Sequence, residues 1–268
     1  MQRLRSSTGR CITGFFDDTS DDATVLLEWI EKLGGAAFCR EYRFDTTLGG
    51  EVIIGSTLLH RAVMNKSNLQ ARVLIDVGVP IDSKDPAGCT ALHYLCGYHA
   101  EKTQPKDGDE MRIAMNAKLH MLIDAGANID LKVDSCKTTP LMAAAFGLWA
   151  GFQCFKPMME ELITLGADCT TQSKYGQTMI HLTAVTDHVQ LMHQLLDTGR
   201  LDINCKCIDG STALFHATPV TLPLLLQRGA DMSITDKYGN DAVSAMIHYH
   251  SMNNDQLVVI WDTEVVCR

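Results

Sequence analysis

Three histidines and one pair of cysteines have residue types and spacings that could carry chemistry. His60, His93 and His181 stand at the same position of similar strings, and one residue separates Cys205 from Cys207. An imidazole can serve as a general base or metal ligand near neutral pH, and a cysteine pair can provide half of a zinc site. However, no second Cys or His pair stands at a suitable spacing, and the chain has no Gly-rich phosphate loop, Gly-x-Ser-x-Gly motif or His-Glu-x-x-His motif. We therefore expect no catalytic residue, no metal site and no cofactor.

The histidines lie in a string that recurs along the chain. Its copies are GSTLLHRA, GCTALHYL, KTTPLMAA, GQTMIHLT and GSTALFHA, at residues 55–62, 88–95, 137–144, 176–183 and 210–217. A second string follows each copy and contains a glycine, at positions 78, 126, 166, 199 and 229. The distance from Thr57 to Gly78 is 21 residues and that from Gly78 to Thr90 is 12, which gives a unit of 33 residues. The chain is therefore built largely from tandem copies of one supersecondary unit.

Each copy has the signals of two helices. A Thr precedes each short apolar run, where its hydroxyl can cap the free backbone donors of a starting helix, and Pro140 suits the first helical position because it has no donor to lose. The glycine of the second string suits the left-handed residue that ends a helix. Further glycines, at 88, 176, 210 and 239, lie in short polar stretches typical of tight turns. We predict an inner helix, an outer helix and a hairpin-like connection for each unit.

This pattern resembles the ankyrin repeat, whose Thr-Pro-Leu-His-x-Ala core is matched most fully at residues 57–62 and, in its proline, at Pro140. The resemblance implies an all-α solenoid of stacked helix-turn-helix units joined by β-hairpin-like loops. It also implies that the repeated histidines hold the adjoining turns by hydrogen bonds. We predict an N-terminal tail with a capping helix at residues 1–54 and an ankyrin repeat domain with a degenerate C-terminal cap at residues 55–268. GNDAVSAM at 239–246 would be a degraded sixth copy.

The segments outside the five copies depart from the repeat. Residues 19–35 have a helix start at Ser20 and a stop at Gly34. One face of this helix is apolar and must be buried; it consists of Leu26, Trp29, Ile30 and Leu33. The long link after the helix leaves room for an extra hairpin around EVII at 51–54, and QLVVIW at 256–261 fits either a closing outer helix or a strand.

Two copies are lengthened between their inner and outer helices. Thr90 and Gly126 are 36 residues apart, 15 more than 21, and Thr139 and Gly166 are 27 apart, 6 more than 21. The first insertion, within 97–116, is charged and is predicted to be a loop. The second, near 146–157, carries the aromatic residues Phe146, Trp149, Phe152 and Phe155. Either Trp149 and Phe152 contact a partner, or these side chains form a local core beneath the polar loop.

The composition predicts an intracellular protein. The chain of 268 residues has 23 basic and 32 acidic side chains, a formal charge of −9, which disfavours nucleic acid as the main partner and permits a basic protein partner. The ten cysteines are spread over different repeat positions and indicate reduced thiols. No apolar run reaches the roughly 20 residues of a membrane span, and the N-terminal segment does not fit a secretory signal. We expect a cytoplasmic location, with the nucleus as an alternative, and no membrane partner.

The function predicted from this architecture is the binding of a partner protein or peptide on the concave face of hairpin tips and inner helices. Residues expected at exposed tips are Lys132, Val133, Lys137, Lys174, Tyr175, Ile208, Lys237 and Tyr238. The tyrosines and the isoleucine are candidate anchors, because aromatic side chains dominate interface energetics, although tyrosine also fits ordinary turn sequence. Lys137 replaces the glycine of other copies and predicts a distorted or longer turn. Two alternatives stay open: a substrate-recruiting adaptor or host-targeting effector, and an enzyme whose active residues lie in the insertions or the N-terminal segment.

Overall fold

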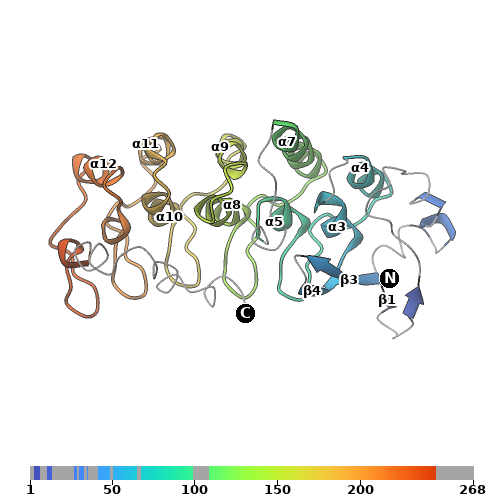
Figure 1. Ribbon diagram of the computed structural model, residues 1–268. Coiled ribbons are helices and arrows are strands. Elements are labelled where there is room, and N and C mark those ends of the chain that lie inside the picture. Colours follow the sequence, from blue (N-terminus) through green and yellow to red (C-terminus); the bar gives the residue numbers. More distant parts are fainter. Residues whose placement is uncertain are drawn as a thin grey trace.

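The computed structural model describes residues 3–6, 11–13, 27–28, 30–32, 35, 42–48, 51–64, 68–98 and 109–245. Within these ranges, a small sheet precedes a row of helix pairs that lie side by side in chain order (Figure 1). The sequence places a helix start after each repeated Thr, and the stack confirms this prediction. Among the described residues, every helix falls short of the length and apolarity that a bilayer crossing requires.

Each unit pairs one inner with one outer element. The inner elements are α3 (Leu58–Met64), α5 (Ala91–Leu95), α8 (Pro140–Trp149), α10 (Met179–Val185) and the 3-10 helix η1 (Ala213–His216). The outer elements are α4 (Leu69–Asp76), α7 (Asp109–Asp124), α9 (Phe155–Thr164), α11 (Val189–Asp197) and α12 (Leu222–Gln227). Most are too short to be stable alone in water, so their stability comes from stacking on neighbours.

The connections between units extend away from the outer helices, and we call them fingers. They are residues 83–89, 132–138, 172–177, 205–211 and 235–240. In Figure 1 the outer helices form the upper row, the inner helices lie beneath them, and the fingers hang below. The fingers and the inner helices thus lie on one side of the stack, which is the side on which the sequence predicts the partner.

The fifth inner element is shortened by a proline. Thr212 and Gly229 are only 17 residues apart, and Pro219 follows η1 closely. The ring of Pro219 restricts Thr218 to extended backbone, and Ala217 is already extended with ψ 135°. The inner helix therefore ends after a single 3-10 turn.

The first insertion is helical over 109–116, so the prediction of a loop is wrong there; residues 99–108 of that insertion lie outside the described residues. The sequence explains the longer α7, because Met111, Met115, Leu119 and Leu122 fall on one helical face. Met115, Leu119 and Leu122 are buried, and Met111 packs against the same core. The charged residues of this segment suggest a loop, although the apolar residues between them have the spacing of a helix.

The second insertion lengthens α8 and is closed by a tight turn before α9. Phe155, the first residue of α9, is buried, and its ring lies edge-on to that of Phe152 with centroids 6.5 Å apart. The ring of Phe155 also occupies the space beside Gly97 and Gly147, where a Cβ atom would approach it to 2.6 and 2.5 Å. Phe155 therefore belongs to the core.

The N-terminal segment forms more sheet than the sequence predicts. Strands β1 (Arg3–Ser6), β2 (Cys11–Thr13), β3 (Tyr42–Leu48) and β4 (Glu51–Ser56) form an antiparallel sheet in the order β2-β1-β3-β4. The hairpin expected around 51–54 is confirmed as β3 and β4. The expected helix is present at 27–28 and 30–32, where Ile30 is buried. The predicted stop at Gly34 lies outside the described residues, and the following Gly35 is left-handed, with φ 66°. Leu26, Trp29 and Leu33 lie outside the described residues.

The sixth copy begins as the sequence predicts. Asp241 takes the place of the repeated Thr, and its Oδ1 accepts a hydrogen bond from Ser244 N at 2.7 Å, as a helix cap does. Residues 242–245 are helical and Ala242 is buried. The rest of this copy and QLVVIW at 256–261 lie outside the described residues.

Candidate functional site

The repeated Thr and His residues form capping boxes at the starts of three inner helices. Thr57 Oγ1 lies 2.7 Å from His60 Nδ1, Thr90 Oγ1 lies 2.9 Å from His93 Nδ1, and Thr178 Oγ1 lies 3.0 Å from His181 Nδ1. In each pair Nδ1 also accepts the backbone N–H of the Thr at 3.2 Å. The proton of each imidazole therefore sits on Nε2.

Two of these imidazoles reach the next finger. His60 Nε2 donates to the carbonyl oxygen of Cys89 at 2.9 Å, and His93 Nε2 donates to that of Thr138 at 3.2 Å. All three side chains are buried, and burial lowers the pKa values of His93 and His181 to about 4, so these two rings are neutral at neutral pH. The histidines hold the turns, as the resemblance implies, and are inaccessible to a substrate.

The cysteine pair stands at the edge of a finger without the remaining ligands of a metal site. Cys205 Sγ accepts a hydrogen bond from Gln172 Nε2 at 3.2 Å, and burial raises the pKa of the Cys207 thiol to about 12. In the part of the chain that the structure describes, no three His, Cys, Asp or Glu side chains come together as metal ligands would.

Neighbouring fingers are joined by backbone hydrogen bonds. Lys174 N donates to Cys136 O at 2.8 Å, Ile208 N donates to Tyr175 O at 2.9 Å, and Lys237 N donates to Asp209 O at 2.7 Å. Between the first two fingers the tie is an ion pair, with Lys84 Nζ 2.6 Å from Asp134 Oδ1. The fingers therefore form a continuous ridge whose side chains keep a fixed order along the stack.

Most predicted contact residues lie on this ridge and face solvent. Ile208 is 69% exposed and Tyr238 is 75% exposed, whereas Tyr175 is half-buried. Lys237 Nζ lies 4.9 Å from the centroid of the Tyr238 ring, and Lys174 Nζ lies 5.7 Å from that of Tyr175. Lysine and tyrosine thus form two matched pairs, on the third and fifth fingers. Lys132, Lys137, Lys174 and Lys237 are exposed as well.

Val133 is an exception, because it is fully buried and not exposed as predicted. It occupies the finger position that Asp85 and Ser173 occupy elsewhere, and both of these are buried too. At this position the backbone N–H bonds across the finger, from Val133 N to Thr138 O at 2.9 Å. The side chain therefore points into the stack and cannot contact a partner.

The finger that contains Lys137 is one residue longer than its neighbours. Lys137 N donates to Val133 O four residues earlier, whereas Gly88 N donates to Asp85 O three residues earlier. Lys137 adopts φ 59°, the left-handed conformation that glycine adopts in the other fingers. The prediction of a longer turn is thereby confirmed, and the lysine accepts a conformation that disfavours side chains.

The aromatic residues of the second insertion are not brought to the ridge. Trp149 ends α8 and Phe152 lies in the turn to α9, and both side chains are half-buried. Each finger precedes its inner helix, whereas this turn follows one, so the two groups lie at opposite ends of α8. Trp149 and Phe152 remain a separate candidate.

Two ridge residues were missed by sequence reasoning. Lys84 and Lys206 lie in the fingers 83–89 and 205–211, at the same place as Lys132 in its finger. The sequence prediction includes Lys132 but not these two equivalent lysines. The signal was present, because all three lysines stand immediately before the residue whose backbone N–H bonds across the finger.

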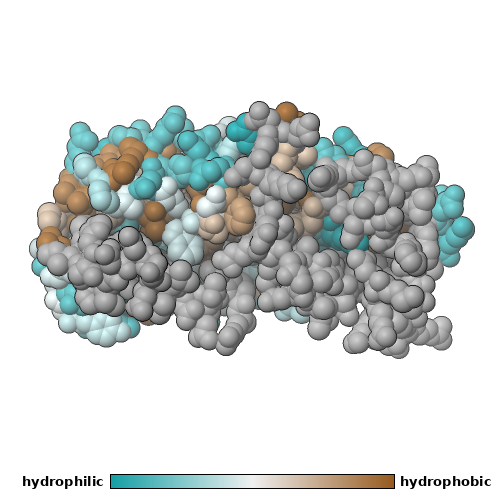
Figure 2. All heavy atoms as spheres, in the orientation of Figure 1, coloured by the Kyte–Doolittle hydropathy of each residue, from teal (hydrophilic) through white to brown (hydrophobic). Residues whose placement is uncertain are grey.

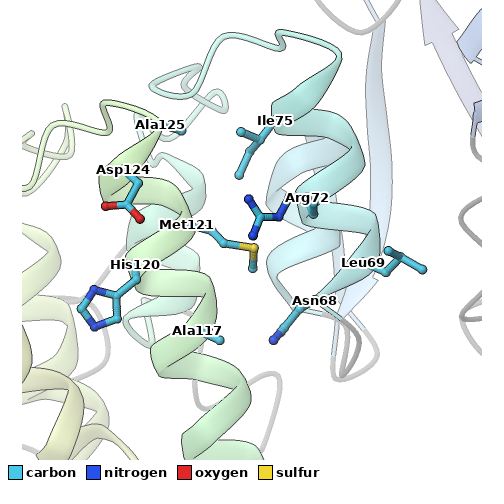
Figure 3. Close-up of a pocket in the computed structure, with 9 residues that line it drawn as sticks. All are labelled: Asn68, Leu69, Arg72, Ile75, Ala117, His120, Met121, Asp124 and Ala125. Carbon is cyan, nitrogen blue, oxygen red and sulfur yellow. The ribbon is translucent and has the colours of Figure 1, made fainter.

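The opposite side of the stack has a groove between the outer helices α4 and α7 (Figure 3). It is lined by Asn68, Leu69, Arg72, Ile75, Ala117, His120, Met121, Asp124 and Ala125. Figure 3 shows Met121 and Arg72 pointing toward each other across it, whereas His120 points away from α4. His120 Nε2 instead lies 3.2 Å from Glu161 Oε1 of α9. Figure 2 shows hydrophilic residues gathered along the row of outer helices, interrupted by hydrophobic ones.

Comparisons with known proteins agree with this architecture. The family model of ankyrin repeats, which comprises three copies, matches residues 148–237. The ankyrin repeat protein OPG189 of variola virus is 21% identical over 258 residues, which cover 74% of this chain and 44% of the viral protein. The E3 ubiquitin-protein ligase KEG of Arabidopsis thaliana is 29% identical over 92 residues, which cover 32% of this chain and 6% of the ligase. The chain thus spans less than half the length of these relatives.

A solved structure shows the same fold. It is a chain of the complex between the predatory endopeptidase Bd0816 of Bdellovibrio bacteriovorus and the immunity protein Bd3460. The TM-score is 0.58 at 20% identity, over 74% of this chain and 94% of that one. Together with the repeated helix pairs and their fingers, these matches show that the chain contains ankyrin repeats, a module of protein–protein interaction.

Proposed function

We propose that this chain binds a partner protein or peptide on the finger ridge and the adjoining inner helices, with no chemistry of its own. The observation that carries the proposal is the exposure of Ile208 and Tyr238 on fingers whose backbones are bonded to one another. Exposed apolar and aromatic side chains on a rigid support bind a partner with little loss of conformational entropy.

The energetics of the ridge favour this role. Ile208 and Tyr238 have large side chains that are mostly exposed, so covering them would remove apolar surface from water. Neither side chain is needed for the finger ladder, which uses backbone atoms. The finger structure therefore does not require these two side chains, and they can serve binding. The adaptor, effector and enzyme alternatives stay predictions, as does an intracellular location.

The test is the simultaneous replacement of Tyr175, Ile208 and Tyr238 by Ala. We expect capture of partners from native lysate to fall at least tenfold, because the exposed anchors are lost. The melting temperature should change by less than about 6 °C, since each surface substitution is usually within about 0.5 kcal/mol. Capture is measured by quantitative mass spectrometry of the bound proteins.

A matched control removes exposed apolar residues from the outer helices. Leu69, Ile113 and Leu226 are 48%, 70% and 38% exposed on α4, α7 and α12. Their replacement by Ala should leave capture unchanged. Equal loss of capture in both variants, or full capture by the ridge variant, would contradict the proposal. Full capture by the ridge variant would leave Trp149 and Phe152 as the candidate contact residues.

A further inference from the structure

The fingers are basic although the chain as a whole is acidic. Within the five finger ranges the charged residues are six lysines and four aspartates: Lys84, Lys132, Lys137, Lys174, Lys206, Lys237, Asp85, Asp134, Asp209 and Asp236. The complete chain has a formal charge of −9. The excess of negative charge therefore lies outside the fingers, and the net charge does not indicate what the ridge attracts.

The finger aspartates are engaged by the fingers themselves. Asp85 is buried and accepts hydrogen bonds from Cys89 N at 2.8 Å and Tyr94 Oη at 2.8 Å. Asp236 Oδ1 likewise accepts Tyr238 N at 2.8 Å, and Asp209 Oδ1 accepts Ser211 Oγ at 2.7 Å. Asp134 is paired with Lys84. Three of these carboxylates thus bond to their own turn or its inner helix, and the fourth, Asp134, neutralises Lys84.

The finger lysines face outward. Lys132, Lys137 and Lys206 are exposed and, within the described ranges, form no ion pair. Lys174 and Lys237 lie over tyrosine rings, which present an apolar surface beside the charge. The last four fingers therefore offer ammonium groups that are not engaged in ion pairs with described residues, and Ile208 provides an apolar site between the two lysine–tyrosine pairs.

The spacing of the fingers matches an extended chain. Adjacent helices pack about 8–10 Å apart, so successive fingers are separated by about 10 Å. A peptide in the extended polyproline II conformation advances about 3.1 Å per residue with three residues per turn, so one turn matches one finger and every third side chain lies on the same face. Carboxylates at every third position would then each meet one finger.

We propose that the finger ridge binds an extended acidic segment of a partner protein, with carboxylates at about every third residue and an apolar side chain at Ile208. This inference rests on the proposed function, because it names the partner chemistry of the same surface. It replaces the basic partner that the net charge alone permits. A carboxylate that meets a finger lysine forms a charge-assisted hydrogen bond, and the apolar contact adds burial that salt does not screen.

A peptide fits this surface better than nucleic acid does. Ile208 and Tyr238 are exposed side by side with the lysines, and such apolar side chains have no partner in a phosphate backbone. A short peptide also senses mainly the ridge, because charges farther than about 8 Å are screened at physiological salt. A long polyanion would extend over the acidic remainder of the chain.

The test measures binding of synthetic peptides of about nine residues by fluorescence anisotropy. One peptide has Glu at every third position and a central Leu, the second has the same composition with contiguous Glu residues, and the third has Lys in place of Glu. We expect the first to bind about tenfold more tightly than the second, the third not to bind, and affinity to fall at least tenfold between about 50 and 500 mM NaCl. A duplex DNA that binds more tightly than the first peptide would overturn the proposal.

Two variants with equal changes of net charge locate the binding. Lys174→Gln, Lys206→Gln and Lys237→Gln together should weaken binding of the first peptide about tenfold or more. Arg72→Gln, Lys156→Gln and Arg200→Gln, at or beside the outer helices, should leave it within about twofold. If the ridge variant binds the acidic peptide as the native chain does, the acidic preference is wrong. The proposed function would still stand if the variant lacking Tyr175, Ile208 and Tyr238 loses its captured proteins.

Discussion

At the scale of single residues, the groups that could do chemistry are used to hold turns. Each Thr and His pair satisfies backbone donors at a helix start, and His60 and His93 bind a carbonyl of the next finger. The sequence identifies this role correctly, because a residue that recurs at the same phase of a repeat serves the repeat. The sequence could not show which lysines are available to bind a partner, because this depends on whether the neighbouring carboxylates pair with them or bond elsewhere.

The buried imidazole of His93 should make stability depend on pH. Burial lowers its pKa from 6.5 to about 4, so the unfolded chain binds a proton at a higher pH than the folded chain does. The unfolding free energy is therefore highest above about pH 6.5 and decreases progressively as the pH falls toward 4. At pH 5 the loss due to one such histidine is about 2 kcal/mol. We expect urea denaturation to show His93→Gln with a shallower decline in unfolding free energy between pH 7 and pH 5.

Glutamine is chosen because it can form the capping box of a Thr without titrating. The variant loses the bond from His93 Nε2 to Thr138 O and is less stable at pH 7. Leu122→Ala serves as a control that is destabilised without any change in a titratable group, and it should keep the native slope. An unchanged slope in His93→Gln would show that His93 does not contribute to the pH dependence.

At the scale of elements, the helix starts were predictable and the lengths were not. The repeated Thr and the glycines mark where helices begin and end, and these signals are local. The extension of α7 depends on whether Met111 and Met115 find a core, and the sheet depends on pairing between β1 and β3 across a long stretch of chain. Such pairings are decided by tertiary contacts and leave little trace in local sequence.

Gly147 shows how packing overrides helical propensity. It lies inside α8, where Ala is favoured over Gly by about 1 kcal/mol. A Cβ atom there would lie 2.5 Å from Cδ2 of the buried Phe155. We therefore expect Gly147→Ala to destabilise the fold by about 1–3 kcal/mol, as overpacking does, measured by urea denaturation.

A second substitution separates the clash from other causes. Phe155→Leu removes part of the ring beside Gly147, and by itself it should destabilise because it opens space in the core. In the double variant the cost of Gly147→Ala should largely disappear, which gives a coupling energy of about 1 kcal/mol or more. Additive effects of the two substitutions would mean that the ring does not limit position 147.

At the scale of the whole molecule, the core is continuous through the first repeats and is nearly divided in the fourth. Residues from Ile30 to Leu195 form one buried cluster, and a smaller one includes Leu214, Leu225 and Ala242. Helices α10 and α11 contribute to both, with Met179 in the first and Ile180 in the second. Because each unit contacts only its neighbours, the C-terminal units are stabilised mainly through α10 and α11.

This division predicts that the C-terminal units can unfold separately. Leu225 of α12 is fully buried, and Leu225→Ala should remove on the order of 2–5 kcal/mol from the smaller cluster. We expect hydrogen exchange, measured by mass spectrometry, to accelerate in η1 and α12 while α8 keeps its native protection. Leu122→Ala, the same change in the larger cluster, should accelerate exchange in α5, α7 and α8 instead.

The two variants also link stability to binding. Ile208 and Lys237 belong to fingers that the C-terminal units support, so Leu225→Ala should weaken partner capture without altering any contact residue. An added osmolyte should restore capture, since the loss would come from local unfolding. Uniform acceleration of exchange along the whole chain by Leu225→Ala would show instead that the repeats unfold as one unit. The fourth repeat would then couple the two clusters more strongly than its divided core suggests.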